Sequence, residues 1–143
     1  MGSHVNFEHE MFHALEKDST RVFEKLLLSE KQAQTRRRSP LLCRTCATLV
    51  TYAESEIEVA GSTRHECVNP AGTSFKVVCY DMVIACTPVS LPTEEHTWFA
   101  GYAWQIADCG SCGIHLGWRF RSHSHEFYGL IEDQLIVGEP ETF

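Results

Sequence analysis

Long hydrophobic runs are missing from this sequence of 143 residues. The longest, such as Leu26 to Leu28, fall far short of the roughly 20 apolar residues that a helix needs to cross a bilayer. The sequence therefore predicts no transmembrane segment and no membrane partner. A disordered chain is excluded as well, because three Trp, four Tyr and eight Phe residues need a core to cover them.

Positive charge is also scarce. The chain has 12 Lys and Arg residues against 19 Asp and Glu residues, which gives a formal net charge of -7. Contacts to phosphate need Lys and Arg, so we expect no nucleic-acid partner. A neutral small molecule or a peptide fits this charge better.

The first 40 residues predict a helical arm followed by a linker. Met1 to His4 reads as the remnant of an expression tag. Residues 5–34 carry a helical apolar stripe, and 35–40 form a basic linker that ends in Pro. We expect the stripe to pack against the rest of the chain or against a second copy, through Phe7, Met11, Leu15, Val22 and Leu26.

The sequence pattern changes at Leu41, where short β-prone runs begin to alternate with turn residues. No helical period is sustained beyond this point, so residues 41–143 predict one all-β domain. The expected strands cover 47–53, 56–60, 75–80, 82–87, 102–108, 113–121 and 126–131.

Two Cys-x-x-Cys pairs have the spacing of a zinc site. Cys43 and Cys46 form the first pair, and Cys109 and Cys112 form the second. Two such turns supply four thiolates, which close a tetrahedral shell and leave no open position for substrate. Gly113 suits the left-handed turn that such a pair needs. The pattern predicts one structural zinc, whereas a redox dithiol or two unrelated turns are the less favoured interpretations.

The three other cysteines have no ligand spacing among themselves. Cys67, Cys79 and Cys86 are expected to be buried thiols, and a disulfide among them is the alternative. His123 and His125 would share one face of a strand. We weigh a second metal site there against a solvated strand end, and favour the solvated end.

All three tryptophans, Trp98, Trp104 and Trp118, fall close together around the second cysteine pair. A hairpin with Cys109 opposite Gly113 would place Trp104 opposite Trp118. The same register sets Tyr102 opposite Phe120 and Ile106 opposite Leu116, with all six side chains on one face. Such a face can form an aromatic box for a small flat group or a cation. A plain aromatic core is the alternative.

These residues carry a specific resemblance. The chain resembles the CULT domain family, which includes the thalidomide-binding domain of cereblon. The likeness covers roughly residues 41–131. Besides both cysteine pairs, it rests on the runs 68–70, 94–104, 117–120 and 127–130.

The resemblance implies a mainly β fold, a zinc-pinned β-tent of two antiparallel sheets, here preceded by the helical arm. It also implies a pocket for cyclic imides such as glutarimide. In that pocket three tryptophans form a cage above an aromatic floor, the imide is hydrogen-bonded largely by backbone groups, and a loop and a rim residue complete the site. The matching residues are Trp98, Trp104, Trp118, Phe120, His96, Asn69, Pro70 and Glu95. Tyr102 joins this predicted set through the hairpin face.

Four positions depart from the cereblon pattern outside the cage. Phe75 and Ala71 stand where cereblon has histidines, Ile106 stands for a valine, and Ala100 stands for the usual proline. They affect the outer ligand contacts and drug-dependent partner recruitment, and leave the cage intact.

The function predicted from these observations is a zinc-stabilised module that binds cyclic imides, and not an enzyme. The ligand would be a glutarimide-type compound, a C-terminal cyclic imide on a protein, or a uridine-like metabolite. One alternative is an enzyme like methionine sulfoxide reductase B, and another is a Yippee-like interaction module. A cullin-RING ubiquitin ligase becomes a partner only if a longer protein carries the adaptor-binding region. A stand-alone CULT protein would be secreted, and a piece of a cereblon would be cytoplasmic or nuclear.

Overall fold

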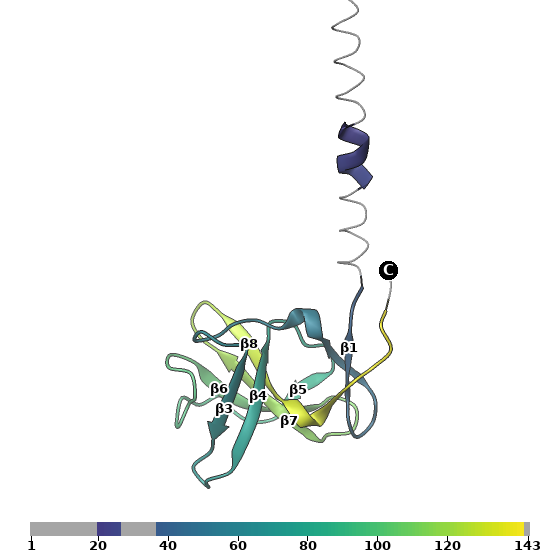
Figure 1. The fold of residues 1–143 in the computed structure, drawn as a ribbon. Coiled ribbons are helices and arrows are strands. Elements are labelled where there is room, and N and C mark those ends of the chain that lie inside the picture. The colour runs from purple at the N-terminus through teal and green to yellow at the C-terminus, as the bar shows by residue number, and fades with distance from the viewer. Residues whose placement is uncertain (1–19, 27–36, 142–143) are drawn as a thin grey trace, which may run out of the picture. The chain divides into compact units, whose positions relative to one another are not determined.

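The computed structural model describes residues 20–26 and 37–141, in two units that are described separately (Figure 1). In the first unit, residues 20–26 form a helix inside the predicted helical region. Val22 and Leu26 of the predicted stripe are each about 60% exposed on it. Phe7, Met11 and Leu15 lie outside the described residues, so the packing of the stripe stays a prediction. No described helix combines the length and the apolar character that crossing a membrane requires.

The second unit, residues 38–141, is built from antiparallel strands in two sheets. The smaller sheet has the order β2-β1-β9, and the larger has the order β3-β4-β8-β7-β6-β5. The strands are β1 (Pro40–Cys43), β2 (Leu49–Tyr52), β3 (Arg64–Val68), β4 (Ser74–Tyr80), β5 (Cys86–Pro88), β6 (Ala103–Cys109), β7 (His115–Arg121), β8 (Glu126–Ile131) and β9 (Leu135–Val137). The predicted fold class, mainly β with two antiparallel sheets, is therefore confirmed.

Two of the predicted strands are wrong. Residues 56–60 reverse on themselves, because Ala60 and Gly61 both adopt positive φ and Val59 bridges to Ser62. Of the run 82–87, only its end belongs to β5. The backbone at Ile84 instead hydrogen-bonds across to Val50 of β2, at 2.7 Å.

Three short strands escaped prediction. β1 and β9 have four and three residues, too few to show an alternating pattern. β3 is an edge strand of mixed composition, and most of its side chains are exposed. A strand with so little burial leaves no hydrophobic signal in the sequence.

Each face of the larger sheet is covered by its own core. On one face, β4, β7 and β8 contribute to a core that joins both sheets: Cys43, Val50, Val78, Tyr80, Cys109, Leu116 and Leu130. On the other face, the same strands pack under the loop that carries Phe99: Cys67, Val77, Cys79, Phe99, Trp118, Phe120, Phe127 and Ile131. The first core holds the cysteine pairs, and the second holds the aromatic site.

The predicted β6–β7 register is wrong by two residues. Trp104 lies opposite Phe120, and Ile106 lies opposite Trp118. The turn closes between Cys109 and Ile114, and a bulge between Ala107 and Asp108 adds one further residue on β7.

The bulge also turns Leu116 to the opposite face from Trp118, into the core between the sheets. Trp104, Ile106, Trp118 and Phe120 remain on one face, because a shift of two residues preserves the side-chain alternation.

Candidate functional site

The two cysteine pairs have the same backbone structure. In the first, the amide of Ala47 donates to Cys43 O at 2.8 Å, and the amide of Cys43 donates to Thr48 O at 2.8 Å. In the second, Gly113 donates to Cys109 O at 2.9 Å, and Cys109 donates to Ile114 O at 2.8 Å. The residue after each pair is left-handed, with φ of 62° at Ala47 and 78° at Gly113. The left-handed turn predicted at Gly113 is confirmed.

The four sulfur atoms form one compact cluster, with every pair within 4.8 Å. Cys43 Sγ lies 3.7 Å from Cys112 Sγ, and Cys46 Sγ lies 3.6 Å from Cys109 Sγ. Zn–S bonds of about 2.3 Å in a tetrahedron would separate the sulfurs by about 3.8 Å. The donor set and its spacing therefore fit a zinc ion held by four thiolates.

Two thiols of this cluster, Cys46 and Cys112, have strongly shifted pKa values. Hydrogen bonding to the Thr48 side chain, whose Oγ1 lies 3.2 Å from Cys46 Sγ, lowers the pKa of Cys46 to about 6. At Cys112 the backbone hydrogen bond with Ile114 lowers the pKa, but burial and the neighbouring sulfurs outweigh it and raise the pKa to about 12. Four thiolates this close need a cation, and a bound zinc would supply that charge.

The remaining cysteines are free thiols. Burial raises the pKa of Cys67 to about 11, and burial raises the pKa of Cys79 and Cys86 to about 12. Cys67 and Cys79 lie in the aromatic core, whereas Cys86 packs against the core between the sheets. The preferred interpretation, unpaired apolar thiols, fits this structure.

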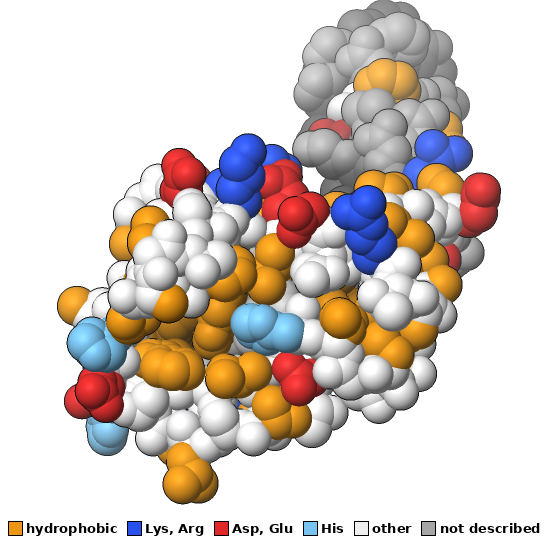
Figure 2. Space-filling model, turned by 90° about the horizontal axis from the view of Figure 1, so that it is seen from below, with side chains coloured by type: hydrophobic (Ala, Val, Ile, Leu, Met, Phe, Trp, Pro, Cys, Tyr) orange, Lys and Arg blue, Asp and Glu red, His pale blue; other side chains and the backbone are white. Residues whose placement is uncertain are grey.

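A cavity of about 450 Å³ opens beside the aromatic core. Eight of the nine residues that the sequence assigned to the ligand line it, together with one that it did not assign. The lining residues are Asn69, Pro70, Thr93, Glu95, His96, Trp98, Trp104, Trp118 and Phe120. Figure 2 shows a face of the molecule on which hydrophobic side chains gather around a hollow.

The three indoles reach this cavity from different elements. Trp104 lies on β6, Trp118 lies on β7, and Trp98 lies in the loop before β6. The rings of Trp98 and Trp118 meet edge to face, with centroids 4.6 Å apart. Behind them Phe75 packs 5.1 Å from Trp118 and 6.3 Å from Trp98, and is not part of the lining.

The indole N–H groups of Trp98 and Trp104 both hydrogen-bond to backbone carbonyls of neighbouring segments. Trp98 Nε1 donates to Val68 O at 3.0 Å, next to Asn69 and Pro70. Trp104 Nε1 donates to Glu95 O at 2.7 Å. With these donors engaged, both rings are held in place and offer the cavity mainly apolar surface.

The loop between β5 and β6 carries backbone groups that are free to bind a ligand. The Trp98 N–H and the His96 C=O have no hydrogen-bond partner among the residues that the structure describes. His96 adopts a left-handed φ of 56°, which is uncommon for a residue with a side chain. Such strain concentrates at functional sites.

Thr93 is the lining residue that the sequence did not predict. Its Oγ1 accepts a hydrogen bond from the Glu95 amide at 3.1 Å, and its backbone bridges to Trp104 in both directions. Nothing in the sequence distinguishes this threonine from others in loops. Only its backbone pairing with β6 shows that it lies beside the cavity.

Tyr102 lies away from the cavity, contrary to the predicted set. Its ring packs 5.2 Å from Phe127, and its hydroxyl lies 2.9 Å from His125 Nδ1. The reason is the β6–β7 register. Because Trp104 pairs with Phe120, Tyr102 lies beyond the last pair of the two strands, next to the β7–β8 turn.

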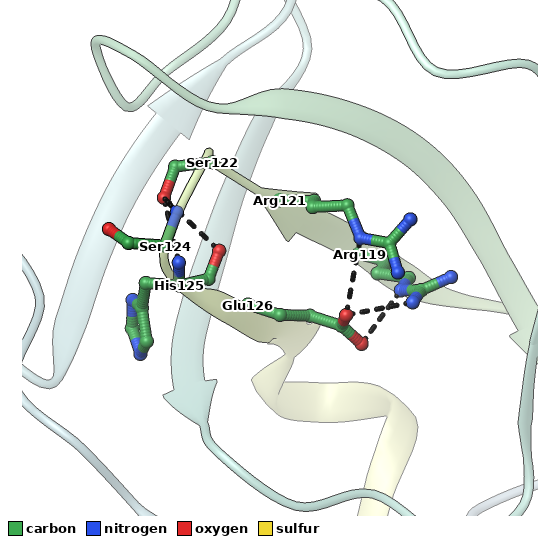
Figure 3. A network of polar contacts seen from close by, with 6 residues as sticks. All are labelled: Arg119, Arg121, Ser122, Ser124, His125 and Glu126. Carbon is green, nitrogen blue, oxygen red and sulfur yellow. Dashed lines mark hydrogen bonds and ion pairs between the residues drawn. The ribbon is translucent and has the colours of Figure 1, made fainter.

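The two histidines of that turn do not share a strand face. Residues 122–125 form the tight turn itself, in which Ser122 N donates to His125 O at 2.8 Å. The Ser122 Oγ also accepts from the His125 amide at 3.0 Å (Figure 3). His123 and His125 are both exposed, and the described residues hold no metal-ligand cluster besides the four cysteines. The predicted strand placement is wrong, because the chain reverses at these residues.

Comparison with known proteins adds a sequence relationship. No family model matches the chain. Cereblon from Gallus gallus is 35% identical over 80 residues, which cover 52% of this chain and 18% of cereblon. The chain resembles the cereblon CULT domain. Cereblon from Xenopus tropicalis is 34% identical over 79 residues, with 52% and 18% covered, and cereblon from Drosophila persimilis is 26% identical over 110 residues, with 68% and 17% covered.

The resemblance inferred from the sequence is thus confirmed, and the chain spans less than a fifth of the length of these curated relatives. A solved structure, the crystal structure of the Mis18 'Yippee-like' domain, matches with a TM-score of 0.50 and 10% identity. The match covers 71% of this chain and 96% of that one. At this identity the match concerns the fold alone.

Proposed function

We propose that this CULT-like chain is a zinc-stabilised binding module that holds a cyclic imide in the cage of Trp98, Trp104 and Trp118. Zinc would be bound by Cys43, Cys46, Cys109 and Cys112 and would be structural, since four thiolates leave no open position. The observation that carries the proposal is the cavity with three indoles in its wall, two of them fixed by hydrogen bonds to backbone carbonyls, that of Val68 at the end of β3 and that of Glu95.

The chemistry of an imide matches this cavity. The ring has apolar CH₂ faces, which indole walls cover while they exclude water. Its edge has one N–H donor between two carbonyl acceptors. The His96 C=O can accept from the imide N–H, and the Trp98 N–H can donate to an imide carbonyl. In a dry cavity, leaving either group unpaired costs ~1–3 kcal/mol.

The rim residues suit the part of the ligand outside the ring. Asn69 and Pro70 sit on the β3–β4 turn, where Asn69 Oδ1 accepts from the Thr73 amide at 2.9 Å. Glu95 and His96 are exposed at the other side of the lining, with Glu95 Oε1 3.5 Å from His96 Nε2. A C-terminal cyclic imide on a protein would place its peptide chain across this rim.

No feature of the cavity favours either alternative function, the reductase or the Yippee-like interaction module. A reductase of the methionine sulfoxide type needs a reactive cysteine there, but no cysteine lines the cavity and burial raises the pKa of Cys67 to about 11. The Yippee-like relative shares only the fold. Recruitment of a cullin-RING ligase would depend on parts of a cereblon that this chain does not match.

The test is titration with glutarimide and with N-methylglutarimide, followed by tryptophan fluorescence and calorimetry. We expect glutarimide to quench the fluorescence and the N-methyl compound to bind far more weakly, because it lacks the donor. Trp104→Ala should weaken glutarimide by ~2–4 kcal/mol, or roughly 30- to 1000-fold, as for a buried aromatic at the centre of an interface.

The matched control is Tyr102→Phe, which changes an aromatic residue of the same hairpin that does not line the cavity. It should bind glutarimide like the unchanged protein. Equal affinity for the two compounds, or full binding by a folded Trp104→Ala variant, would show that the indoles are core and that the site lies elsewhere.

A further inference from the structure

Cys86 lies directly opposite a proposed zinc ligand. β5 pairs with β6 in antiparallel register, and Cys86 is the residue facing Cys109 across the two strands. Both residues contact the core between the sheets. The other two free thiols have no such position, because Cys67 faces Phe75 and Cys79 faces Gly129.

The hydrogen bonds on either side define the geometry of this pair. Gly110 N donates to Ala85 O at 3.0 Å, and Val89 N donates to Ile106 O at 2.8 Å. Because hydrogen-bonded and non-hydrogen-bonded pairs alternate, Cys86 and Cys109 form a non-hydrogen-bonded pair, with Cα atoms about 4.5 Å apart. That distance lies at the short end of the range of about 4.4–6.8 Å that disulfides span.

The four-sulfur cluster is complete without Cys86. Cys86 is therefore a fifth cysteine beside the site. It is not needed to bind the metal, and its sulfur is available to bond with the sulfur of Cys109. Cys109 is buried, but its neighbour in the cluster, Cys112, is exposed, so a small oxidant would approach Cys109 past Cys112.

We propose that Cys86 and Cys109 form a redox site, in which a peroxide joins the two residues as a disulfide and thereby releases the zinc. This inference rests on the proposed zinc site and is independent of imide binding. It also gives a role to a cysteine that the zinc and the cage do not use.

The proposed reaction has two steps. The Cys109 thiolate attacks one oxygen of hydrogen peroxide, which forms a sulfenic acid and releases hydroxide. The Cys86 sulfur then attacks the Cys109 sulfur, its thiol proton leaves with the sulfenic hydroxyl as water, and the disulfide forms. The two sulfurs lose two electrons and the peroxide is reduced. Only Cys43, Cys46 and Cys112 would then remain as thiolates to hold the zinc, and it would be released.

The consequence for the fold is specific. A Cys86–Cys109 disulfide keeps β5 joined to β6 within the larger sheet, but removes the metal link from Cys109 to Cys43 of β1 in the smaller sheet. Oxidation would loosen the contact between sheets while the larger sheet stays intact.

The first experiment treats the zinc-loaded full chain with hydrogen peroxide, follows zinc release with a chromogenic chelator, and maps disulfides by mass spectrometry. We expect one zinc per chain before treatment and a Cys86–Cys109 disulfide that accumulates in step with zinc release. A disulfide within a pair, Cys109–Cys112 or Cys43–Cys46, with Cys86 left as a free thiol would overturn the proposal.

The second experiment compares Cys86→Ala with Cys79→Ala, which removes a buried thiol that does not face a ligand. After oxidation, a thiol reductant should restore zinc binding in the unchanged protein and in Cys79→Ala. In Cys86→Ala the sulfenic acid has lost its partner and oxidises further, so recovery should fall by about threefold or more. Equal recovery in the two variants would contradict the proposal.

The outcomes separate this inference from the proposed function. A protein that contains no zinc but binds glutarimide would refute the metal site and leave the cage. Zinc release with the expected disulfide, in a protein that does not bind glutarimide, would support the redox site alone.

Discussion

At the scale of single residues, the two cysteine turns differ in a way that has an energetic consequence. Ala47 and Gly113 occupy equivalent left-handed positions, yet only one of them is glycine. A side chain in this conformation costs roughly 1–2 kcal/mol. A Cβ at Gly113 would meet no atom within 4 Å, so the cost of adding one there is conformational and not steric.

We predict opposite effects for the two exchanges. Gly113→Ala should destabilise the zinc-loaded protein by about 1 kcal/mol. Ala47→Gly should stabilise it by about 0.5–1 kcal/mol, the relief of strain being partly offset by the freedom of glycine in the unfolded chain. Urea unfolding of both variants measures this. Ala103→Gly, in strand β6, is the control and should destabilise, and stabilisation by Gly113→Ala would contradict the account.

The same pair of positions shows what the sequence reveals about single residues. Gly113 was predictable, because a glycine after a Cys-x-x-Cys pair is typical of the left-handed turn. Ala47 and His96 were not, since residues with side chains rarely adopt positive φ and nothing in the sequence marks them.

At the scale of elements, the β7–β8 hairpin carries a paired set of charges on the strands beside its tight turn (Figure 3). Arg119 donates to both carboxylate oxygens of Glu126, at 2.9 and 2.8 Å, and Arg121 lies 3.4 Å from the same carboxylate. Hydrogen bonding to Arg119 holds the pKa of Glu126 below its ordinary value of 4.5.

This pair predicts a pH dependence of stability. A carboxylate with a lowered pKa in the folded state contributes fully above pH 4.5, and its contribution is lost as the pH falls through the folded value. Glu126→Gln should therefore destabilise the protein at neutral pH and reduce the loss of stability between about pH 5 and 3. Unfolding curves at several pH values measure the difference, in which any loss of zinc common to both proteins cancels.

The control for this prediction is Glu139→Gln, at a carboxylate with no ion pair in the described part of the chain. It should follow the unchanged protein across the same pH range. Identical pH profiles for Glu126→Gln and the unchanged protein would contradict the role of the pair.

The elements of the fold were predictable where burial leaves a pattern. β4, β6, β7 and β8 form the centre of the larger sheet, and β-prone runs between turn residues indicated them within one or two residues. The β6–β7 register was not predictable, because the turn closes at Ile114 and the bulge beside Ala107 adds a residue on β7, and no local composition signals either. The three indoles still line one cavity despite this error, because the shift preserves which face each of them occupies, whereas Tyr102 does not line it.

At the scale of the whole molecule, the cysteine cluster joins two sheets that share one core. Cys43 ends β1 of the smaller sheet, and Cys109 ends β6 of the larger one. The spacing of the cysteines predicted that distant segments would meet, but the sequence carried no sign that β9 completes the smaller sheet beside β1. Long-range pairing of a three-residue strand depends on the surrounding fold and not on its own residues.

The last prediction concerns removal of the metal. Without zinc, the pKa of Cys112 is raised to about 12, so this sulfur is a protonated thiol at neutral pH, and no metal bond links the two sheets. A unit of 38–141 has a modest core, and metal binding in such a unit is coupled to folding. The turn through Cys109 and Cys112 also connects the strands that carry Trp104 and Trp118.

We therefore expect a zinc chelator, with reductant at neutral pH, to abolish the near-ultraviolet circular dichroism of the tryptophans and glutarimide binding together. Adding zinc back should restore both. A metal-free protein that keeps its tryptophan signal and its midpoint of thermal unfolding would show that the two cores hold the sheets without the metal.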